Sequence, residues 1–96
     1  IPAMKYLQAP HVVARRLGQE LLLVPVKGNL ADMRQVFTLN ATGEAIWQSL
    51  ALPVTLDQVV ERLCAAFHVP ESTARLDAAE CLADLSARGL VETGSA

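Results

Sequence analysis

The spacing of the apolar residues changes abruptly at one point of the chain, within the segment VFTLNATGEAIW at residues 36–47. Before this point apolar side chains alternate with a period of two, as in a strand buried on one face. After it, Ala45, Ile46 and Leu50 recur three and four apart, which is helical spacing. Asn40 or Thr42 can cap that helix by accepting a hydrogen bond from a free backbone N–H. The chain therefore passes directly from strand to helix, in a segment that contains no His or Cys.

Two further strands are predicted before this junction. HVVARRLG (11–18) is typical of a short strand, and ELLLVPV (20–26) is a continuous apolar run, which favours a strand buried on both faces. The third predicted strand, MRQVFTL (33–39), alternates and directs Phe37 and Leu39 toward the core. Together these segments predict an antiparallel meander of three strands.

Two more helices are predicted after the first. The segment at residues 55–67 opens with Thr55 and has Gln58 three residues later, the spacing of a capping box. The last helix begins between residues 70 and 73 and ends before Gly89, a residue suited to a left-handed stop. The predicted fold class is α+β, with a three-stranded antiparallel sheet followed by a three-helix bundle that resembles a winged helix-turn-helix.

The length of 96 residues fits one domain, and a hydrophobic content of 52% is enough to bury a core. Residues 1–10 carry two prolines and no clear period, so we expect a mobile N-terminal arm. Residues 11–92 are expected to form the folded domain, and residues 93–96 a frayed tail. The cysteines, Cys64 and Cys81, match neither a zinc pattern nor a redox pair and fall at apolar helical positions.

Charge and hydropathy narrow the range of functions. The net charge of −2 argues against a nucleic-acid-binding protein, which usually carries a basic patch. The longest apolar run, LLLVPV, is too short to span a bilayer, and the first ten residues lack the apolar run of a signal peptide. We therefore expect a cytoplasmic protein without a membrane partner.

Few side chains in the sequence suggest chemistry. His68 follows Cys64 by four residues, which could place two metal ligands on one helical face, but a third ligand is missing apart from the distant His11. A histidine at a helix end, near exposed carbonyl groups, is the favoured interpretation. No nucleophile has a neighbouring base. The sequence predicts no enzyme activity, no cofactor and no metal.

The last helix carries Asp77, Glu80 and Asp84 at intervals of three and four residues. These carboxylates form either a solvated face or a contact face for a basic partner. A recognition helix that reads DNA would instead present basic and amide side chains, and phosphate would be repelled by this acidic density. A winged-helix nucleic-acid-binding regulator therefore remains only an alternative.

Three segments, FTLNATGEAIW, TLDQVVERLCAAFHV and AAECLADLSARGLVE, together resemble the PqqD family, whose members are also called RiPP precursor peptide recognition elements. The likeness covers residues 11–92 and rests on the order and spacing of its parts. It departs from the family pattern in a longer loop around VKGNLADMRQ and in the turn SLALPVT. The matching residues are Phe37, Leu39, Asn40, Thr42, Gly43, Ile46, Trp47, Phe67, Leu82, Leu85, Gly89 and Leu90.

The resemblance implies a peptide-binding chaperone. Such a protein captures the leader of a ribosomally made precursor peptide and presents it to a modifying enzyme, often a radical SAM enzyme, in the synthesis of pyrroloquinoline quinone or of another product. The leader adds as a strand to the third strand and lies in a groove against the third helix. The implied peptide-binding residues are Met33, Arg34, Gln35, Val36, Phe37, Thr38, Arg75, Ala78, Cys81, Leu82, Leu85 and Arg88.

The meander leaves its third strand at the edge of the sheet. Residues 33–39 contain no Pro or Lys, the residues that commonly protect such an edge. A second copy of the chain or the N-terminal arm could cover it instead of a peptide, so a homodimer through this edge stays open. The sequence does not decide which alternate residues of the strand direct their N–H groups outward.

Overall fold

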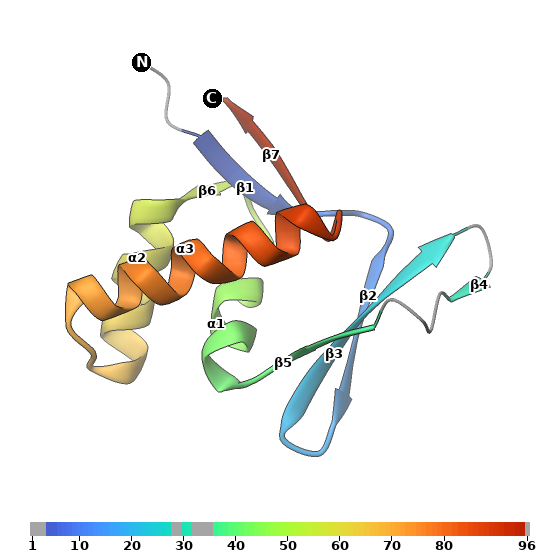
Figure 1. The fold of residues 1–96 in the computed structure, drawn as a ribbon, viewed down its shortest axis with the longest axis horizontal. Helices are drawn as coiled ribbons and strands as arrows, with labels where there is room; N and C mark the ends of the chain where they lie inside the picture. Colours follow the sequence, from blue (N-terminus) through green and yellow to red (C-terminus); the bar gives the residue numbers. More distant parts are fainter. Residues whose placement is uncertain (1–3, 28–29, 32–35, 96) are drawn as a thin grey trace.

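The computed structural model describes residues 4–27, 30–31 and 36–95 (Figure 1). Its fold is α+β, with three helices and antiparallel sheets, as predicted. The helices are α1 (Ala41–Ser49), α2 (Leu56–Phe67) and α3 (Glu71–Ala87). The strands are β1 (Met4–Gln8), β2 (Val12–Leu17), β3 (Glu20–Lys27), β4 (Leu30–Ala31), β5 (Phe37–Leu39), β6 (Val54–Thr55) and β7 (Val91–Ser95).

The predicted meander is present and is centred on β3. Strand β2 pairs with β3 along its whole length, from Val12 opposite Pro25 to Leu17 opposite Glu20. Both β4 and β5 also pair with β3, at its two ends. Because a strand has only two sides, β4 and β5 together occupy the side that β2 leaves free.

The described part of the predicted third strand, residues 36–39, contains β5. Leu39 of β5 lies opposite Leu21, and Phe37 lies opposite Leu23. Val36 precedes β5 and is not in a strand. Residues 33–35, which include three of the predicted peptide-binding residues, lie outside the described residues.

A second sheet, with the strand order β6-β1-β7, corrects the prediction of a single three-stranded sheet. In Figure 1, β1 and β7 lie side by side, with β7 following the last helix. The predicted mobile arm at residues 1–10 is wrong for residues 4–8, which form β1, and the predicted frayed tail at residues 93–96 is wrong for residues 93–95, which belong to β7. Residues 1–3 and 96 lie outside the described residues.

Backbone hydrogen bonds attach the end of β1 to the rest of the fold. The N–H of Gln8 donates to the carbonyl of Leu50 (2.9 Å), and the N–H of Ala9 donates to that of Leu90 (3.0 Å). The side chain of Gln8 also donates to the carbonyl of Trp47 (2.7 Å). These bonds join segments far apart in the chain, so the local pattern of apolar and polar residues could not reveal them.

One hydrophobic core serves both sheets and all three helices. Its members come from β3, β5, β6 and β7 as well as from the helices, and α3 contributes buried residues along its length. The core residues are Leu21, Leu23, Leu39, Ile46, Trp47, Leu50, Val54, Val59, Val60, Leu63, Ala74, Ala78, Leu82, Leu85, Leu90 and Val91. Across residues 4–27, 30–31 and 36–95, no helix has both the length and the hydropathy needed to cross a bilayer.

The helix boundaries follow the capping residues that the sequence indicated. Of the two candidate caps for α1, Asn40 accepts a hydrogen bond from the N–H of Gly43 (2.9 Å). Thr55 and Gln58 form the predicted capping box of α2, with bonds of 3.2 and 2.9 Å. Gly89 follows α3 with φ +72°, in the left-handed region. The likeness of the bundle to a winged helix-turn-helix stays a prediction.

Candidate functional site: a groove beside a strand edge

A cavity of about 480 Å³, here named the β5/α3 groove, lies between β5 and α3. In Figure 1, α3 passes across the molecule beside β5, and the chain runs in opposite directions in the two elements. Four elements and the residue before α1 line the groove, so it lies where the strand-to-helix junction meets the last helix. The lining residues are Glu20, Phe37, Thr38, Leu39, Asn40, Thr42, Gly43, Ile46, Asp77, Glu80, Cys81 and Asp84.

The backbone of β5 forms one wall of this groove. Within the part of the chain that the structure describes, β5 pairs with β3 on one side and with no strand on the other. Thr38 is exposed between the half-buried Phe37 and the buried Leu39, as expected for an alternating strand. The outer N–H and C=O groups of β5 are thus available to pair with an added strand.

The sequence at the junction brings α1 close against this strand. A Cβ atom on Gly43 would come within 2.9 Å of the Leu39 Cδ2 atom and 3.2 Å of its Cβ atom. Glycine therefore allows the first turn of α1 to lie directly on β5. Asn40 is the single residue between the end of β5 and the start of α1, and its side chain caps the helix. The groove owes its shape to this short connection.

The groove is acidic. Asp77, Glu80 and Asp84 project from one face of α3, since their intervals of three and four residues match the helical repeat, and Glu20 joins them from β3. Among the described residues, the ion pairs involve other carboxylates, those of Glu44, Asp57 and Glu71. The four groove carboxylates therefore lack a cationic partner within this part of the chain.

Cys81 lies among these carboxylates and is half-buried. Burial, and after it the negative charge of Asp84, raises the pKa of the Cys81 thiol to about 11. The thiol is therefore neutral near pH 7 and forms a weakly polar part of the groove wall. Its environment is the opposite of the electropositive one that activates a cysteine nucleophile.

Arg88 supplies positive charge near one end of the groove. Its guanidinium carbon lies 4.7 Å from the centroid of the Phe37 ring, which is cation–π geometry. Phe37 begins β5 and Arg88 follows the last turn of α3, so this contact joins the two walls.

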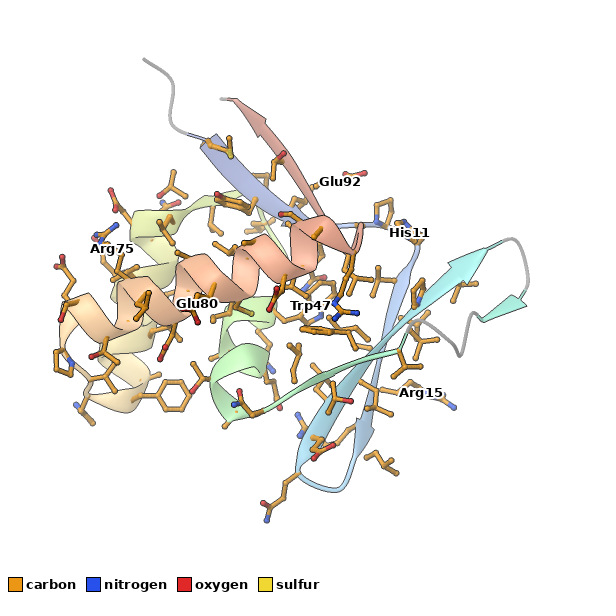
Figure 2. All side chains as sticks on the ribbon, in the orientation of Figure 1. His11, Arg15, Trp47, Arg75, Glu80 and Glu92 are labelled. Atoms are coloured by element: carbon orange, nitrogen blue, oxygen red, sulfur yellow. The ribbon has the colours of Figure 1, made fainter. Side chains whose placement is uncertain are left out.

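Arg75 lies elsewhere, on a second cavity of about 440 Å³ between α2 and α3, here named the α2/α3 cavity. Its guanidinium donates to Asp57 (2.8 Å) and lies 3.6 Å from Glu71. The hydrogen bond to Asp57 raises the pKa of Arg75. Figure 2 shows Arg75 and Glu80 leaving α3 on different sides. The α2/α3 cavity is lined by Asp57, Val60, Glu61, Cys64, Glu71 and Arg75.

The structure brings only some of the predicted peptide-binding residues to the groove. Phe37, Thr38 and Cys81 line it. Val36 is half-buried beside β5 and does not line the groove. Three further predicted residues lie on α3, do not line the groove and are buried in the core: Ala78, Leu82 and Leu85.

Several residues that line the groove were absent from the predicted peptide-binding set. Asn40, Thr42, Gly43 and Ile46 belong to the junction segment, whose strand-to-helix change is itself a signal that its residues lie beside the third strand. The sequence allows either a solvated face or a contact face for the acidic residues of α3, and in the structure these residues lie on the groove.

The alternative chemistry of His68 and Cys64 finds no support in the geometry. His68 ends α2 with φ +54°, and its backbone N–H donates to the Cys64 carbonyl (3.1 Å). His11 lies beside β2, on the far side of the molecule from α2 (Figure 2). Within the described ranges, no three His, Cys, Asp or Glu side chains converge as metal ligands do.

Comparison with known proteins agrees with this geometry. The family model described as "Coenzyme PQQ synthesis protein D (PqqD)" matches residues 20–91. The solved structure "TbiB1 in Complex with the TbiA(beta) Leader Peptide" is similar, with 26% sequence identity and a TM-score of 0.72. The alignment covers 94% of this chain and 98% of that one. No curated protein sequence gives a significant match.

Proposed function

The chain belongs to the PqqD family, and we propose that it captures the leader of a ribosomally made precursor peptide and presents it to a modifying enzyme. The observation that carries the proposal is the outer edge of β5, which pairs with no strand of the described residues and borders the groove opposite α3. The similar TbiB1 structure contains a leader peptide, which supports the same class of ligand here.

Strand addition is the mode of binding that this edge favours. An extended leader segment exchanges backbone hydrogen bonds with β5, and each bond contributes about 0.5–1.5 kcal/mol net. Alternate side chains of the added strand then face α3. Phe37, Thr38 and Cys81 line the groove and are proposed to contact the leader, and the same role is proposed for residues 33–36.

The groove binds the leader, and a separate partner enzyme is proposed to modify the precursor peptide. The thiol of Cys81 is neutral near pH 7, and the described residues that line the groove include no histidine or lysine to activate it. We propose that a radical SAM enzyme receives the bound leader and that this chain supplies no cofactor. The family description names coenzyme PQQ synthesis, whereas TbiB1 binds the TbiA(beta) leader, so a different precursor is also compatible with the proposal.

The charge of the groove disfavours the nucleic-acid alternative. Asp77, Glu80 and Asp84 occupy the face of α3 that borders the groove, where a DNA-reading helix would need cationic or amide side chains. Titration with duplex DNA at two salt concentrations tests this point. Tight binding with a steep salt dependence would contradict the peptide proposal.

Amide hydrogen exchange tests strand addition directly. The probe is a synthetic peptide spanning the leader of a short precursor encoded beside this chain. Outward N–H groups of residues 37–39 are expected to exchange rapidly in the free protein and to become protected in the complex. Protection should follow alternate residues, because alternate N–H groups of β5 already bond to β3. Binding without any protection in β5 would refute strand addition.

Oligomeric state is the necessary control for this test. A second copy that covered β5 would protect the same amides without peptide. Sedimentation at several protein concentrations separates the two cases, since protection by a second copy grows with protein concentration. Protection by the peptide should instead increase with peptide concentration, while sedimentation continues to report the mass of one chain.

A further inference from the structure

We propose that the β5/α3 groove selects leaders carrying two basic side chains at alternate positions of the bound strand, where they pair with Glu80 and Asp84. This inference rests on the proposed function and adds the charge and spacing of the ligand. The groove combines four carboxylates with a strand edge that none of the strands resolved in residues 4–27, 30–31 and 36–95 covers, so the charge borders a backbone surface that favours an extended peptide.

The preference for a basic ligand is inferred from which carboxylates form ion pairs with arginine. Elsewhere in the described residues, carboxylates meet arginines: Glu44 pairs with Arg16, and Asp57 with Arg75. The groove carboxylates Asp77, Glu80 and Asp84 form no such pair there. Like charges at these helical spacings repel one another. A basic ligand would remove that repulsion, whereas an acidic ligand would add to it.

The separation of Glu80 and Asp84 along α3 matches the separation of alternate side chains along a strand. Glu80 and Asp84 are four residues apart on α3, which places them ~6 Å apart along the helix axis. Side chains two residues apart in a strand lie on the same face, ~6.5–7 Å apart. A segment of the pattern Lys/Arg-x-Lys/Arg can therefore direct both cations to these two carboxylates. Adjacent basic residues cannot, because their side chains point to opposite faces.

Arg88 indicates where along the groove the basic pair belongs. Its guanidinium stacks on Phe37 at the end of the groove where β5 begins. A basic ligand side chain is repelled by Arg88 at that end and attracted toward Asp84 and Glu80, which lie one and two helical turns before Arg88 on α3. The groove thus has an electrostatic direction, which favours one placement of the leader.

Selection from a display library tests the preference without knowledge of the natural leader. Random twelve-residue peptides are selected against the wild-type chain and against a variant with Glu80→Lys and Asp84→Lys. The control variant carries Glu61→Lys and Glu92→Lys, the same change in net charge at exposed positions outside the groove. Lysine is a good helix former, and near the end of α3 it suits the helix dipole, so the groove variant should fold.

Wild-type binders should be enriched in Lys or Arg at alternate positions. Their affinity for the groove variant should fall about tenfold or more, since two attractive exposed pairs become repulsive. The control variant should bind within about twofold of wild type. Changing both basic residues of a selected peptide to Glu should restore binding to the groove variant. Raising the salt concentration should weaken the wild-type complex.

Two other outcomes are distinguishable. Binders that protect the β5 amides, show no basic enrichment and bind both double variants equally would overturn the charge preference and leave the proposed function intact. A selection in which no binder protects β5 would overturn the proposed function, and the charge preference with it.

Discussion

Two cavities that border α3 are alike in volume and in their acidic residues, but they differ in structure and in charge pairing. Their volumes are about 480 and 440 Å³, each contains one half-buried cysteine, and each has at least three carboxylates. The α2/α3 cavity lies between two helices, whose backbone groups bond within each helix. The β5/α3 groove has the outer edge of a strand as one wall.

A second difference concerns charge. Arg75 lies among the carboxylates of the α2/α3 cavity and contacts Asp57 and Glu71. The carboxylates of the groove have no such partner in the described residues. Volume and acidity alone therefore do not distinguish a peptide site. An unpaired backbone edge does, because it offers the main-chain hydrogen bonds that any extended peptide can use.

Alkylation of the two cysteines should distinguish the cavities most strongly. A rise in the Cys81 pKa from 9.0 to about 11 lowers its thiolate population at pH 8 about a hundredfold, and alkylation requires the thiolate. Iodoacetamide labelling of Cys81, followed by peptide mass spectrometry, should be slower by about that factor in the folded chain than in denaturant. The rate should climb as pH rises toward 11.

The bound peptide extends the same experiment. Peptide should slow Cys81 labelling further and leave the rate at Cys64 unchanged, because Cys64 lines the other cavity. Asp84→Asn serves as the electrostatic control: removing the negative charge lowers the pKa of Cys81 and speeds its labelling. Equal protection of both cysteines by peptide would remove the distinction between the two cavities.

Local signals in the sequence predicted the boundaries of several elements, whereas the groove itself was implied by the resemblance to the PqqD family. The change of period at residues 36–47, the cap at Asn40 and the box at Thr55 are all short-range patterns, and each defines an element boundary that the structure confirms. The predicted peptide-binding residues on α3 are divided in the structure between the groove, the core and the α2/α3 cavity. Helical spacing indicated which residues share a face, but it did not show that Arg75 faces α2 whereas Asp84 faces β5.

The second sheet was missed for a different reason. Strand β1 pairs with β7 at the opposite end of the chain, for example Tyr6 with Thr93. Neither segment has a clear alternation of apolar and polar residues, since MKYLQ and VETGS are short and mixed. Their strand conformation depends on tertiary pairing, which a local pattern cannot reveal. The predicted domain limits at residues 11 and 92 therefore cut through this sheet.

Removing the caps of α1 and α2 should have a smaller effect, and it compares a cap that lines the groove with one that does not. Asn40→Ala and Thr55→Ala each remove a side chain that accepts a hydrogen bond at a helix start, and each should cost about 0.5–2 kcal/mol in the free energy of unfolding. Only Asn40 lines the groove. Peptide affinity should therefore fall for Asn40→Ala beyond what Thr55→Ala causes. Urea unfolding and a peptide titration measure the two effects.

A conservative variant separates the cap from the amide group. Asn40→Ser keeps an oxygen that can cap α1, so it should recover most of the stability and the affinity. If Asn40→Ala and Thr55→Ala lower stability equally and both leave affinity unchanged, the start of α1 does not contribute to the peptide site.

The smallest expected effect comes from Arg75→Ala, which makes the α2/α3 cavity resemble the groove in charge. Arg75 and its partners are exposed, so solvent screens the ion pairs and their loss should change the melting temperature only slightly. The variant leaves Asp57, Glu61 and Glu71 without this cation, yet it creates no strand edge.

Calorimetry should therefore still report one peptide per chain, with affinity close to wild type. Cys64 should stay unprotected against alkylation. A second binding event, accompanied by protection of Cys64, would mean that uncompensated acidic charge is sufficient for peptide binding and that the edge of β5 is not the deciding feature.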